Sequence, residues 1–190
     1  MKKFSETLKK YNINLSRATI STLQVNMGKL CNQACSHCHV EAGPKRTEIM
    51  NIDIISKILK LLERKNEIKV VDITGGAPEL NSEFKYFVQR IKSKGLHVID
   101  RCNLTVLHEK GQENTAEFLA KNNVEIIASL PCYQEQNVDK QRGIGVFSKS
   151  IESLKNLNKL GYGKGAKGLK LNLVYNPLGA FLPPDQKLLE

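Results

Sequence analysis

Apolar residues along the chain fall into short blocks with two different spacings. Continuous runs rich in β-branched residues predict strands, whereas apolar residues three and four positions apart predict amphipathic helices. Strands are expected at residues 19–26, 68–74, 97–101, 124–130 and 169–175. Helices are expected at residues 52–64, 83–93, 114–121 and 147–160, the first of them capped by Asn51.

This repeated alternation of strand and helix predicts an α/β fold with a parallel sheet and right-handed crossovers. The strands are mostly continuous apolar runs, so we expect both faces of the sheet to be covered. A partial (β/α) barrel is the first choice. A doubly wound open sheet is the alternative.

Both ends of the chain carry further helix signals. Apolar residues at helical spacing near the N-terminus are Phe4, Leu8, Tyr11 and Leu15. They predict a helical extension over residues 1–18 that packs across the bottom of the barrel. Pro183-Pro184-Asp185 predicts another helix start, and the sequence ends within its first turns. Because such an end would leave a sheet edge uncovered, we expect residues 19–190 to be an incomplete core domain.

Composition indicates a soluble globular protein. The chain has 190 residues, of which 41% are hydrophobic and 25% charged. No apolar run approaches the roughly 18 residues of a membrane span, and the charged N-terminus lacks a signal peptide, so we expect a cytoplasmic protein without a membrane partner. The net charge is +10, but the basic residues are scattered, so we expect no nucleic-acid partner. An anionic small-molecule substrate fits the charge equally well.

Three of the five cysteines crowd into eight positions directly after the first expected strand: Cys31, Cys35 and Cys38. An odd number of cysteines argues against a disulfide framework, and their clustering favours a metal site. Thiolates suit iron–sulfur clusters and zinc. Three thiolates leave one iron of a [4Fe–4S] cluster open to a small molecule, because such a cluster normally takes four ligands.

Two other interpretations of the cysteines stay open. On a helix, positions i, i+4 and i+7 share one face, so the three could be core residues, although Asn32, Gln33 and Ser36 suit a helix interior poorly. With His37 or His39 they could instead form a structural Cys3His zinc site. In that case the chain is a non-catalytic binding fragment.

The C-x3-C-x2-C spacing resembles the signature of the radical S-adenosylmethionine (radical SAM) superfamily, with His37 at the position that usually holds an aromatic residue. A second motif, Gly75-Gly76-Ala77-Pro78-Glu79, closes the second expected strand and resembles the "GGEP" segment of that superfamily. The resemblance implies that the backbone and an acidic group of this segment meet the methionine amino group. Here Ala77 replaces the usual Glu, and an acid stands at Glu79.

Longer stretches resemble one subgroup, the radical SAM/Cys-rich domain proteins, which include arsenosugar biosynthesis proteins. The matching stretches are residues 31–44, 100–107, 129–133, 139–146 and 173–177. The resemblance implies a partial barrel of radical SAM type with about five of six β/α units present. It also implies a further Cys-rich C-terminal region beyond residue 190.

The resemblance implies a reaction. The open iron chelates S-adenosylmethionine, and one electron, from a donor such as flavodoxin or ferredoxin, cleaves it to release a 5′-deoxyadenosyl radical. In the arsenosugar proteins this radical is expected to add to the arsenic of a methylated arsenical. Another small molecule or a peptide is the alternative substrate.

Several polar residues follow the expected strands, where β/α barrels build their sites. Asn103 and Ser129 are candidates to hold the ribose or the methionine carboxylate, with local turn chemistry as the alternative. Arg142 is a candidate to meet a substrate carboxylate, or else a solvated loop residue. Cys102 and Cys132 follow neighbouring strands and are candidates to face one barrel mouth and hold an arsenical, or else to be small buried residues.

Overall fold

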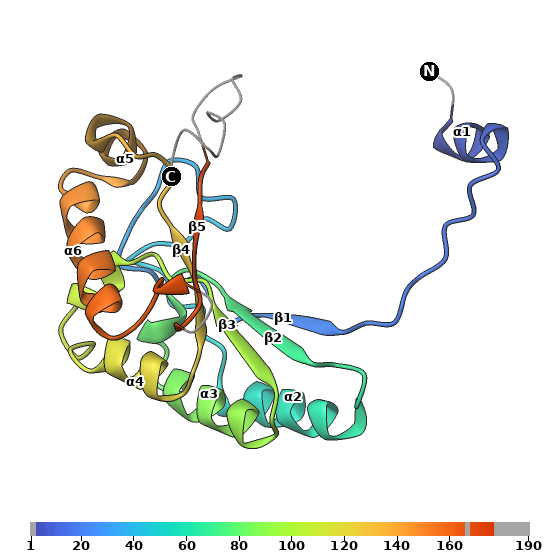
Figure 1. The fold of residues 1–190 in the computed structure, drawn as a ribbon, viewed down its shortest axis with the longest axis horizontal. Helices are drawn as coiled ribbons and strands as arrows, with labels where there is room; N and C mark the ends of the chain where they lie inside the picture. The colour runs from blue at the N-terminus through green and yellow to red at the C-terminus, as the bar shows by residue number, and fades with distance from the viewer. Residues whose placement is uncertain (1–2, 166–167, 177–190) are drawn as a thin grey trace.

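The computed structural model describes residues 3–165 and 168–176, which are built around one five-stranded parallel sheet (Figure 1). The strands are β1 (Thr22–Asn26), β2 (Val70–Thr74), β3 (His97–Asp100), β4 (Glu125–Ser129) and β5 (Leu171–Val174). Each strand pairs with the one before it, in the order β1-β2-β3-β4-β5. A doubly wound sheet reverses its strand order, whereas a β/α barrel does not. The prediction of an α/β partial barrel is therefore confirmed, and the open-sheet alternative is wrong.

Helices connect the strands and cover one side of the sheet (Figure 1). Those predicted from apolar spacing all form, with bounds that differ by at most one residue: α2 (Ile52–Arg64), α3 (Phe84–Ser93), α4 (Thr115–Lys121) and α6 (Val146–Lys159). The Asn51 side chain accepts a hydrogen bond from the Ile54 amide, as expected of an N-cap. Three further elements were not predicted: α5 (Glu135–Arg142) and the 3-10 turns η1 (Pro78–Leu80) and η2 (Thr105–His108). In α5 only Val138 is apolar, so its spacing carries no helix signal.

The hydrophobic core lies between the sheet and these helices. Alternate strand residues point towards the helices and are at most 4% exposed: Val25, Val71, Ile73, Val98, Ile126 and Ala128. They pack in one cluster with the buried faces of α2, α3, α4 and α6, which include Ile55, Phe87, Leu119 and Leu157. Burial of this apolar surface is the main force that holds the barrel wall together.

The opposite face of the sheet is polar and open, which corrects the expectation that both faces are covered. The register pairs Gln24 with Asp72 and Asn26 with Thr74, so these side chains lie on the same face, away from the core. Gln24 and Asn26 are exposed, and Thr74 is half-buried. Because the strand order never reverses, right-handed crossovers place all connecting helices on one side. The other side becomes the concave interior of the partial barrel.

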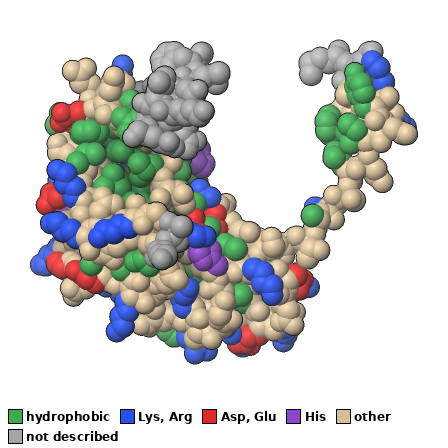
Figure 2. All heavy atoms as spheres, in the orientation of Figure 1, with side chains coloured by type: hydrophobic (Ala, Val, Ile, Leu, Met, Phe, Trp, Pro, Cys, Tyr) green, Lys and Arg blue, Asp and Glu red, His purple; other side chains and the backbone are tan. Residues whose placement is uncertain are grey.

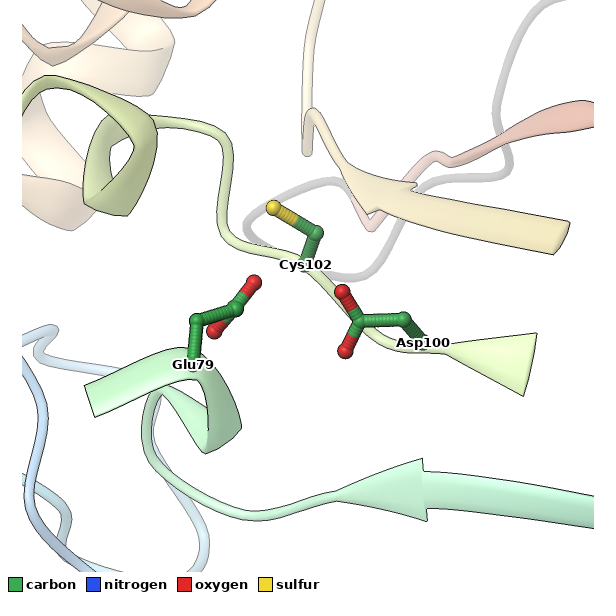
Figure 3. A group of neighbouring side chains, drawn as sticks. All are labelled: Glu79, Asp100 and Cys102. Carbon is green, nitrogen blue, oxygen red and sulfur yellow. The ribbon is translucent and has the colours of Figure 1, made fainter. Parts of the chain in front are cut away.

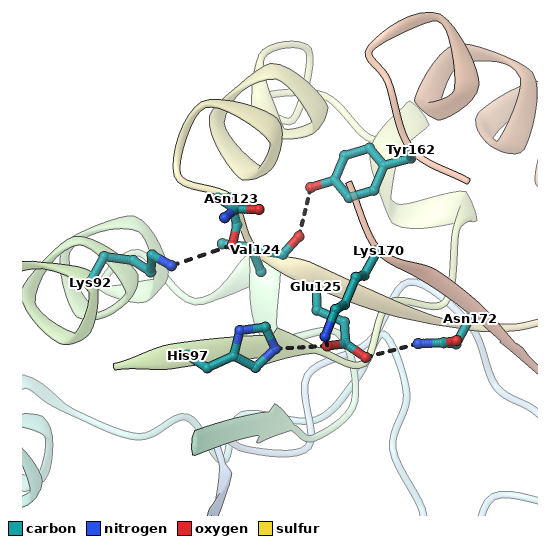
Figure 4. Close-up of polar contacts among 8 residues, drawn as sticks. All are labelled: Lys92, His97, Asn123, Val124, Glu125, Tyr162, Lys170 and Asn172. Carbon is teal, nitrogen blue, oxygen red and sulfur yellow. Dashed lines mark hydrogen bonds and ion pairs between the residues drawn. The ribbon is translucent and has the colours of Figure 1, made fainter. Parts of the chain in front are cut away.

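At the amino-terminal end of this inner face, one carboxylate links three strands (Figure 4). Glu125 at the start of β4 lies 2.7 Å from Nε2 of His97 on β3 and accepts a 2.8 Å hydrogen bond from Asn172 on β5. Lys170 lies 3.8 Å from the same carboxylate. These contacts give the three strands a shared polar anchor.

The N-terminal helix does not pack on the barrel, contrary to expectation. Helix α1 (Phe4–Lys10) has no buried residue and lies at the end of an extended segment away from the sheet (Figure 1). Its apolar side chains stand open to solvent (Figure 2). Asn12 adopts a left-handed φ of 57° just after the helix, so Leu15 does not continue its face. The expected domain boundary at residue 18 stays a prediction.

Two other sequence expectations concern the ends of the chain and membranes. The helix expected from Pro183 lies outside the described residues. Within residues 3–165 and 168–176, no helix combines the length and the apolar character that crossing a bilayer requires.

The first prediction concerns Tyr162, whose side chain pins the segment before β5 to β4. Its ring is fully buried, and its hydroxyl donates a 2.9 Å hydrogen bond to the Val124 carbonyl (Figure 4). Tyr162→Phe leaves that buried carbonyl without a donor, so we expect the free energy of unfolding to fall by about 1–3 kcal/mol. Urea unfolding followed by circular dichroism measures the loss. The control is Tyr86→Phe, since Tyr86 is 42% exposed and should tolerate the change; equal stability of both variants contradicts the role of Tyr162.

Candidate functional site

A cavity of about 440 Å³ lies on the inner face, where the strands end. All five strands or the residues directly after them contribute to it, as do the loop after β1 and the end of α5. Its lining includes Cys31, Cys35, His37, Cys38, Gly75, Gly76, Arg101, Asn103, Ser129 and Arg142. Most of the residues predicted from separate motifs therefore meet in one place, at the end of the barrel where β/α folds build their sites.

The three motif cysteines lie on an irregular loop between β1 and α2. Residues 31–40 form turns rather than a helix, so the interpretation of the cysteines as one face of a core helix is wrong. The loop is held by its own backbone: the Cys31 amide donates to the Gly43 carbonyl, and the Gly43 amide donates to the Lys29 carbonyl. The Ser36 amide donates to the Gln141 carbonyl at 3.1 Å, which ties the loop to α5.

Hydrogen-bond donors point at two of the three sulfurs. The Gln33 amide lies 3.4 Å from Cys31 Sγ, and the Asn103 side-chain amide lies 3.5 Å from the same atom. The Ala42 amide lies 3.4 Å from Cys38 Sγ. Donors at a sulfur favour the thiolate, which is the form that binds metal ions. The donor set therefore fits a thiolate-held metal group.

The spacing of the sulfurs bears on whether they hold an iron–sulfur cluster or a single ion. Among the described residues, Sγ of Cys31, Cys35 and Cys38 do not form a group whose atoms all lie within 4.8 Å of one another. A tetrahedral zinc ion with Zn–S bonds of about 2.3 Å needs sulfurs about 3.8 Å apart. A four-iron cluster holds its thiolates on separate irons and accepts a wider spacing. As they stand, the three sulfurs therefore do not form a ready-made site for one zinc ion.

Arg142 supplies positive charge beside the cysteines. Burial raises the pKa of the Cys31 and Cys35 thiols, while the Arg142 charge acts in the opposite direction on Cys35. Burial, assisted by Arg142, lowers the pKa of His37 and favours its neutral form. The guanidinium Nη1 donates to the Ser129 carbonyl at 2.5 Å, so Arg142 is a fixed part of the cavity wall rather than a solvated loop residue.

The two glycines after β2 pack directly against the cysteine loop. The Gly76 amide donates to the Gly28 carbonyl, and the Ala77 amide donates to the Leu30 carbonyl. A Cβ atom at Gly76 would lie 2.4 Å from the Leu30 carbonyl oxygen, one residue before Cys31. At Gly75, where φ is 149°, a Cβ would lie 2.8 Å from the Gly28 carbonyl oxygen. Both positions need glycine because two backbones touch there.

Asn103 serves the cysteine loop from the other side. Its side-chain amide donates to Asn32 Oδ1 at 2.8 Å as well as to Cys31 Sγ, and its Oδ1 accepts the Val106 amide at 2.9 Å. Asn103 therefore makes the local hydrogen bond expected of a turn residue, and it also lines the cavity. Thr105 extends this network, since its hydroxyl accepts from Gln33 at 2.6 Å and from Asn32 at 2.9 Å.

Other candidate residues do not reach the cavity. Ala77, Pro78 and Glu79 are buried beneath it, so the Glu79 carboxylate is not placed to meet a ligand inside the cavity. Cys102 is fully buried beside Glu79. Cys132 belongs to a separate small apolar cluster and lies 3.8 Å from the Tyr175 hydroxyl. The two thiols therefore do not share the barrel mouth, and the alternative of small buried residues describes them.

Sequence reasoning missed the strongest ion pair of the inner face. Arg101 follows β3 and lines the cavity, and its Nε and Nη2 atoms each donate at 2.8 Å to a different oxygen of Asp72. Gln24 donates to the same carboxylate at 3.0 Å. The sequence carried a signal for this polar inner face, namely polar residues at alternate positions of the expected strands. We did not use this signal, because we expected helices to cover both faces of the sheet.

Comparison with known families matches residues 25–176 to the radical SAM superfamily. The chain belongs to this superfamily of enzymes, whose members use S-adenosylmethionine and characteristically carry a [4Fe–4S] cluster. The expectation of these two cofactors is thereby confirmed. The matched segment begins within β1 and includes every residue that lines the cavity except Gln24.

Curated relatives include archaeal and bacterial proteins. A probable GTP 3′,8-cyclase of Pyrococcus horikoshii is 24% identical over 155 residues, which cover 82% of this chain and 47% of the cyclase. The putative peptide biosynthesis protein YydG of Bacillus subtilis is 27% identical over 117 residues, covering 60% of this chain and 36% of YydG. The chain thus spans about half the length of the cyclases it matches.

Solved structures share the fold. Streptococcus suis SuiB bound to S-adenosylmethionine superposes with a TM-score of 0.62 at 19% identity, over 82% of this chain and 34% of SuiB. The protein anSMEcpe, solved with bound S-adenosylmethionine and a peptide, gives 0.62 at 20% identity, over 81% of this chain and 42% of that protein. At these identities the likeness supports the partial barrel and not a shared substrate.

The second prediction tests the contact between the glycine turn and the cysteine loop. In Gly76→Ala the new methyl group must displace the backbone just before Cys31, so we expect the anaerobically reconstituted protein to lose most of its bound iron. Gly43→Ala is the matched control, because a Cβ there meets nothing nearer than the Gln33 carbonyl oxygen at 3.9 Å. Iron per chain is the measurement. Full iron loading of Gly76→Ala contradicts this account of the turn.

Proposed function

We propose that residues 25–176 form the catalytic core of a radical SAM enzyme in which Cys31, Cys35 and Cys38 bind the [4Fe–4S] cluster. The observation that carries this proposal is that the three thiols line one cavity at the carboxyl ends of the strands, within the segment that matches the radical SAM superfamily. When bound, the cluster supplies the electron that cleaves S-adenosylmethionine into methionine and a 5′-deoxyadenosyl radical. An electron donor such as a flavodoxin or a ferredoxin belongs to this proposal.

The residues around the cysteines are proposed to position S-adenosylmethionine. Gly75 and Gly76 offer backbone at the cavity wall, with no side chain between it and a ligand. His37, Asn103 and Ser129 supply polar groups at the same wall. Apolar lining from Val40, Ala42, Ile127 and Val174 favours exclusion of water, which protects a reactive radical.

The charge of the cavity supports an anionic substrate. Arg101 and Arg142 line it, and no acidic residue does so within residues 3–165 and 168–176. Arg142 is 9% exposed and is committed to the Ser129 carbonyl, whereas the Arg101 side chain is 39% exposed. Asp72 holds Arg101 in a two-point contact and leaves its Nη1 atom available to a ligand. We therefore propose Arg101 as the group that meets the substrate.

The particular substrate we propose is a methylated trivalent arsenical. The radical would form a carbon–arsenic bond, and the arsenic radical that results would lose one electron, which the cluster that supplied the first electron could take back. Support comes from the longer motifs that resemble the radical SAM/Cys-rich subgroup. The arginines of the cavity can donate a hydrogen bond to the oxygen of such an arsenical. Since neither Cys102 nor Cys132 lines the cavity, we propose an arginine contact in place of a thiol contact. Another small molecule or a peptide is the alternative, and the relatives named above include proteins of both kinds.

The third prediction tests the cluster ligands. Cys31→Ala, Cys35→Ala and Cys38→Ala each remove one thiolate, so we expect loss of the broad absorbance near ~400 nm and of 5′-deoxyadenosine formation with dithionite as reductant. Cys132→Ala is the control, because this thiol lies outside the cavity and should leave both signals unchanged. A complete cluster in Cys35→Ala excludes the proposed ligand set.

The fourth prediction separates substrate binding from cofactor cleavage. In Arg101→Gln the charged donor is lost, which should lower kcat/KM for dimethylarsinite about 10- to 100-fold, the loss expected for one hydrogen bond to a charged group. Dithionite-driven 5′-deoxyadenosine formation without substrate should stay normal. The control is Arg64→Gln, an exposed residue at the end of α2. Unchanged turnover removes Arg101 from the substrate site, and loss of cofactor cleavage places it at S-adenosylmethionine instead.

A further inference from the structure

A second group of potential metal ligands lies beneath the cavity, apart from the three motif cysteines. One carboxylate oxygen of Glu79, one of Asp100 and Sγ of Cys102 all lie within 4.8 Å of one another (Figure 3). Glu79 belongs to η1, Asp100 ends β3, and Cys102 follows two residues later. None of the three lines the cavity, and their exposed fractions are 3%, 0% and 0%.

The carboxylates of this group have no basic partner among the described residues. All four oxygens of Glu79 and Asp100 are buried, and none makes a hydrogen bond within the described part of the chain. The charged neighbours that act on Asp100 are Glu79 and Asp72, which are also acidic. Buried carboxylates are normally paired, hydrogen-bonded or bound to a metal ion. Two such groups that face each other and the Cys102 thiol, with no basic residue among the groups that act on them, call for a cation or for protons.

We propose that Glu79, Asp100 and Cys102 bind a divalent metal ion, and that this ion is zinc. The donor set combines one sulfur with carboxylate oxygens, a mixture that suits a borderline-soft ion and not magnesium or calcium, which take oxygen ligands. Full burial favours a structural site, because a catalytic zinc ion keeps a position open to water or substrate. A structural zinc ion takes four ligands, and the second oxygen of either carboxylate can supply the fourth, since both oxygens of Glu79 and of Asp100 are free of hydrogen bonds in the described part of the chain. Binding releases the thiol proton of Cys102, and any proton held by the carboxyl groups, to solvent.

The position of the group indicates what a bound ion would do. Glu79 stands three residues after Gly76, which packs against the cysteine loop at Leu30. Cys102 directly precedes Asn103, which donates to Cys31 Sγ. An ion bound between these two segments holds Gly76 and Asn103 in place, and both of these residues contact the loop that carries the three motif cysteines. Its role is positioning, and it requires nothing of the reaction proposed above.

Protons are the competing explanation. Burial raises the pKa of Glu79 and Asp100, and the acidic partner raises that of Asp100 further, so a neutral pair that shares hydrogen bonds would also relieve the charge. Burial raises the pKa of the Cys102 thiol in the same way. The two explanations differ in metal content and in the response to neutral isosteres.

Elemental analysis of the full chain after dialysis against EDTA distinguishes them. We expect about one zinc ion per chain in the wild-type protein and in the variant with Cys31, Cys35 and Cys38 all changed to alanine, which cannot hold the cluster. The triple-alanine variant is expected to lose the cluster but to keep zinc. Its zinc content therefore tests this proposal independently of the cluster proposal. Cys132→Ser is the matched thiol control and should retain the ion.

Substitutions within the group should remove the ion. In the protein that already carries the three cysteine-to-alanine changes, Cys102→Ser and Asp100→Asn should each lose zinc. After replacement by Co²⁺, the sulfur-to-cobalt charge-transfer absorption should appear in the triple-alanine protein and vanish when Cys102→Ser is added, because Cys31, Cys35 and Cys38 can no longer bind cobalt there. If Cys102→Ser does not fold, the metal content of Asp100→Asn decides. Absence of zinc and of the cobalt absorption from the wild-type and triple-alanine proteins overturns the proposal, and so does zinc that survives in Asp100→Asn.

Discussion

The one-way order of the strands is the constraint on which the rest of this structure depends. Each strand adds beside its predecessor, and right-handed crossovers therefore place every connecting helix on the same side. The residues facing those helices are apolar and buried, and they form the core. The residues facing the other way have no layer to cover them, so the sheet can carry Gln24, Asp72 and Arg101 along its inner face. The topology therefore leaves room for a cavity whose lining is partly polar and partly apolar.

Within that frame, the loop of the three cysteines is held from two sides. On one side, Gly76 brings the turn after β2 into backbone contact with Leu30. On the other, Asn103 after β3 reaches Cys31 Sγ with its side-chain amide. The loop itself has no regular secondary structure, so its shape depends on these neighbours. The buried group formed by Glu79, Asp100 and Cys102 lies between the same two segments, which is why its occupancy matters for the cysteines.

Apolar spacing was enough to place the barrel wall, because α2, α3, α4 and α6 each have one apolar stripe and a clear end. Apolar spacing did not predict α5, because that helix contains only one apolar residue. It also did not predict where α1 lies, because spacing within a helix does not show what the helix packs against. The cysteine spacing located the site, but the pairing of Arg101 with Asp72 was missed. Asp72 lies on β2 and Arg101 directly follows β3, so only the pairing of these two strands brings them together. The reason for the glycines also differs from the one that the resemblance implies. Gly76 is needed because the backbone at Leu30 packs against it, whether or not a ligand is bound.

The central claim is that three thiolates hold a cluster with one iron open to S-adenosylmethionine. Electron paramagnetic resonance of the anaerobically reconstituted, dithionite-reduced chain tests this most directly, recorded with and without S-adenosylmethionine. The account predicts the signal of a reduced [4Fe–4S] cluster whose g values shift when S-adenosylmethionine is added, because the molecule binds the open iron. An iron-free protein, or a cluster signal that S-adenosylmethionine leaves unchanged, would contradict it.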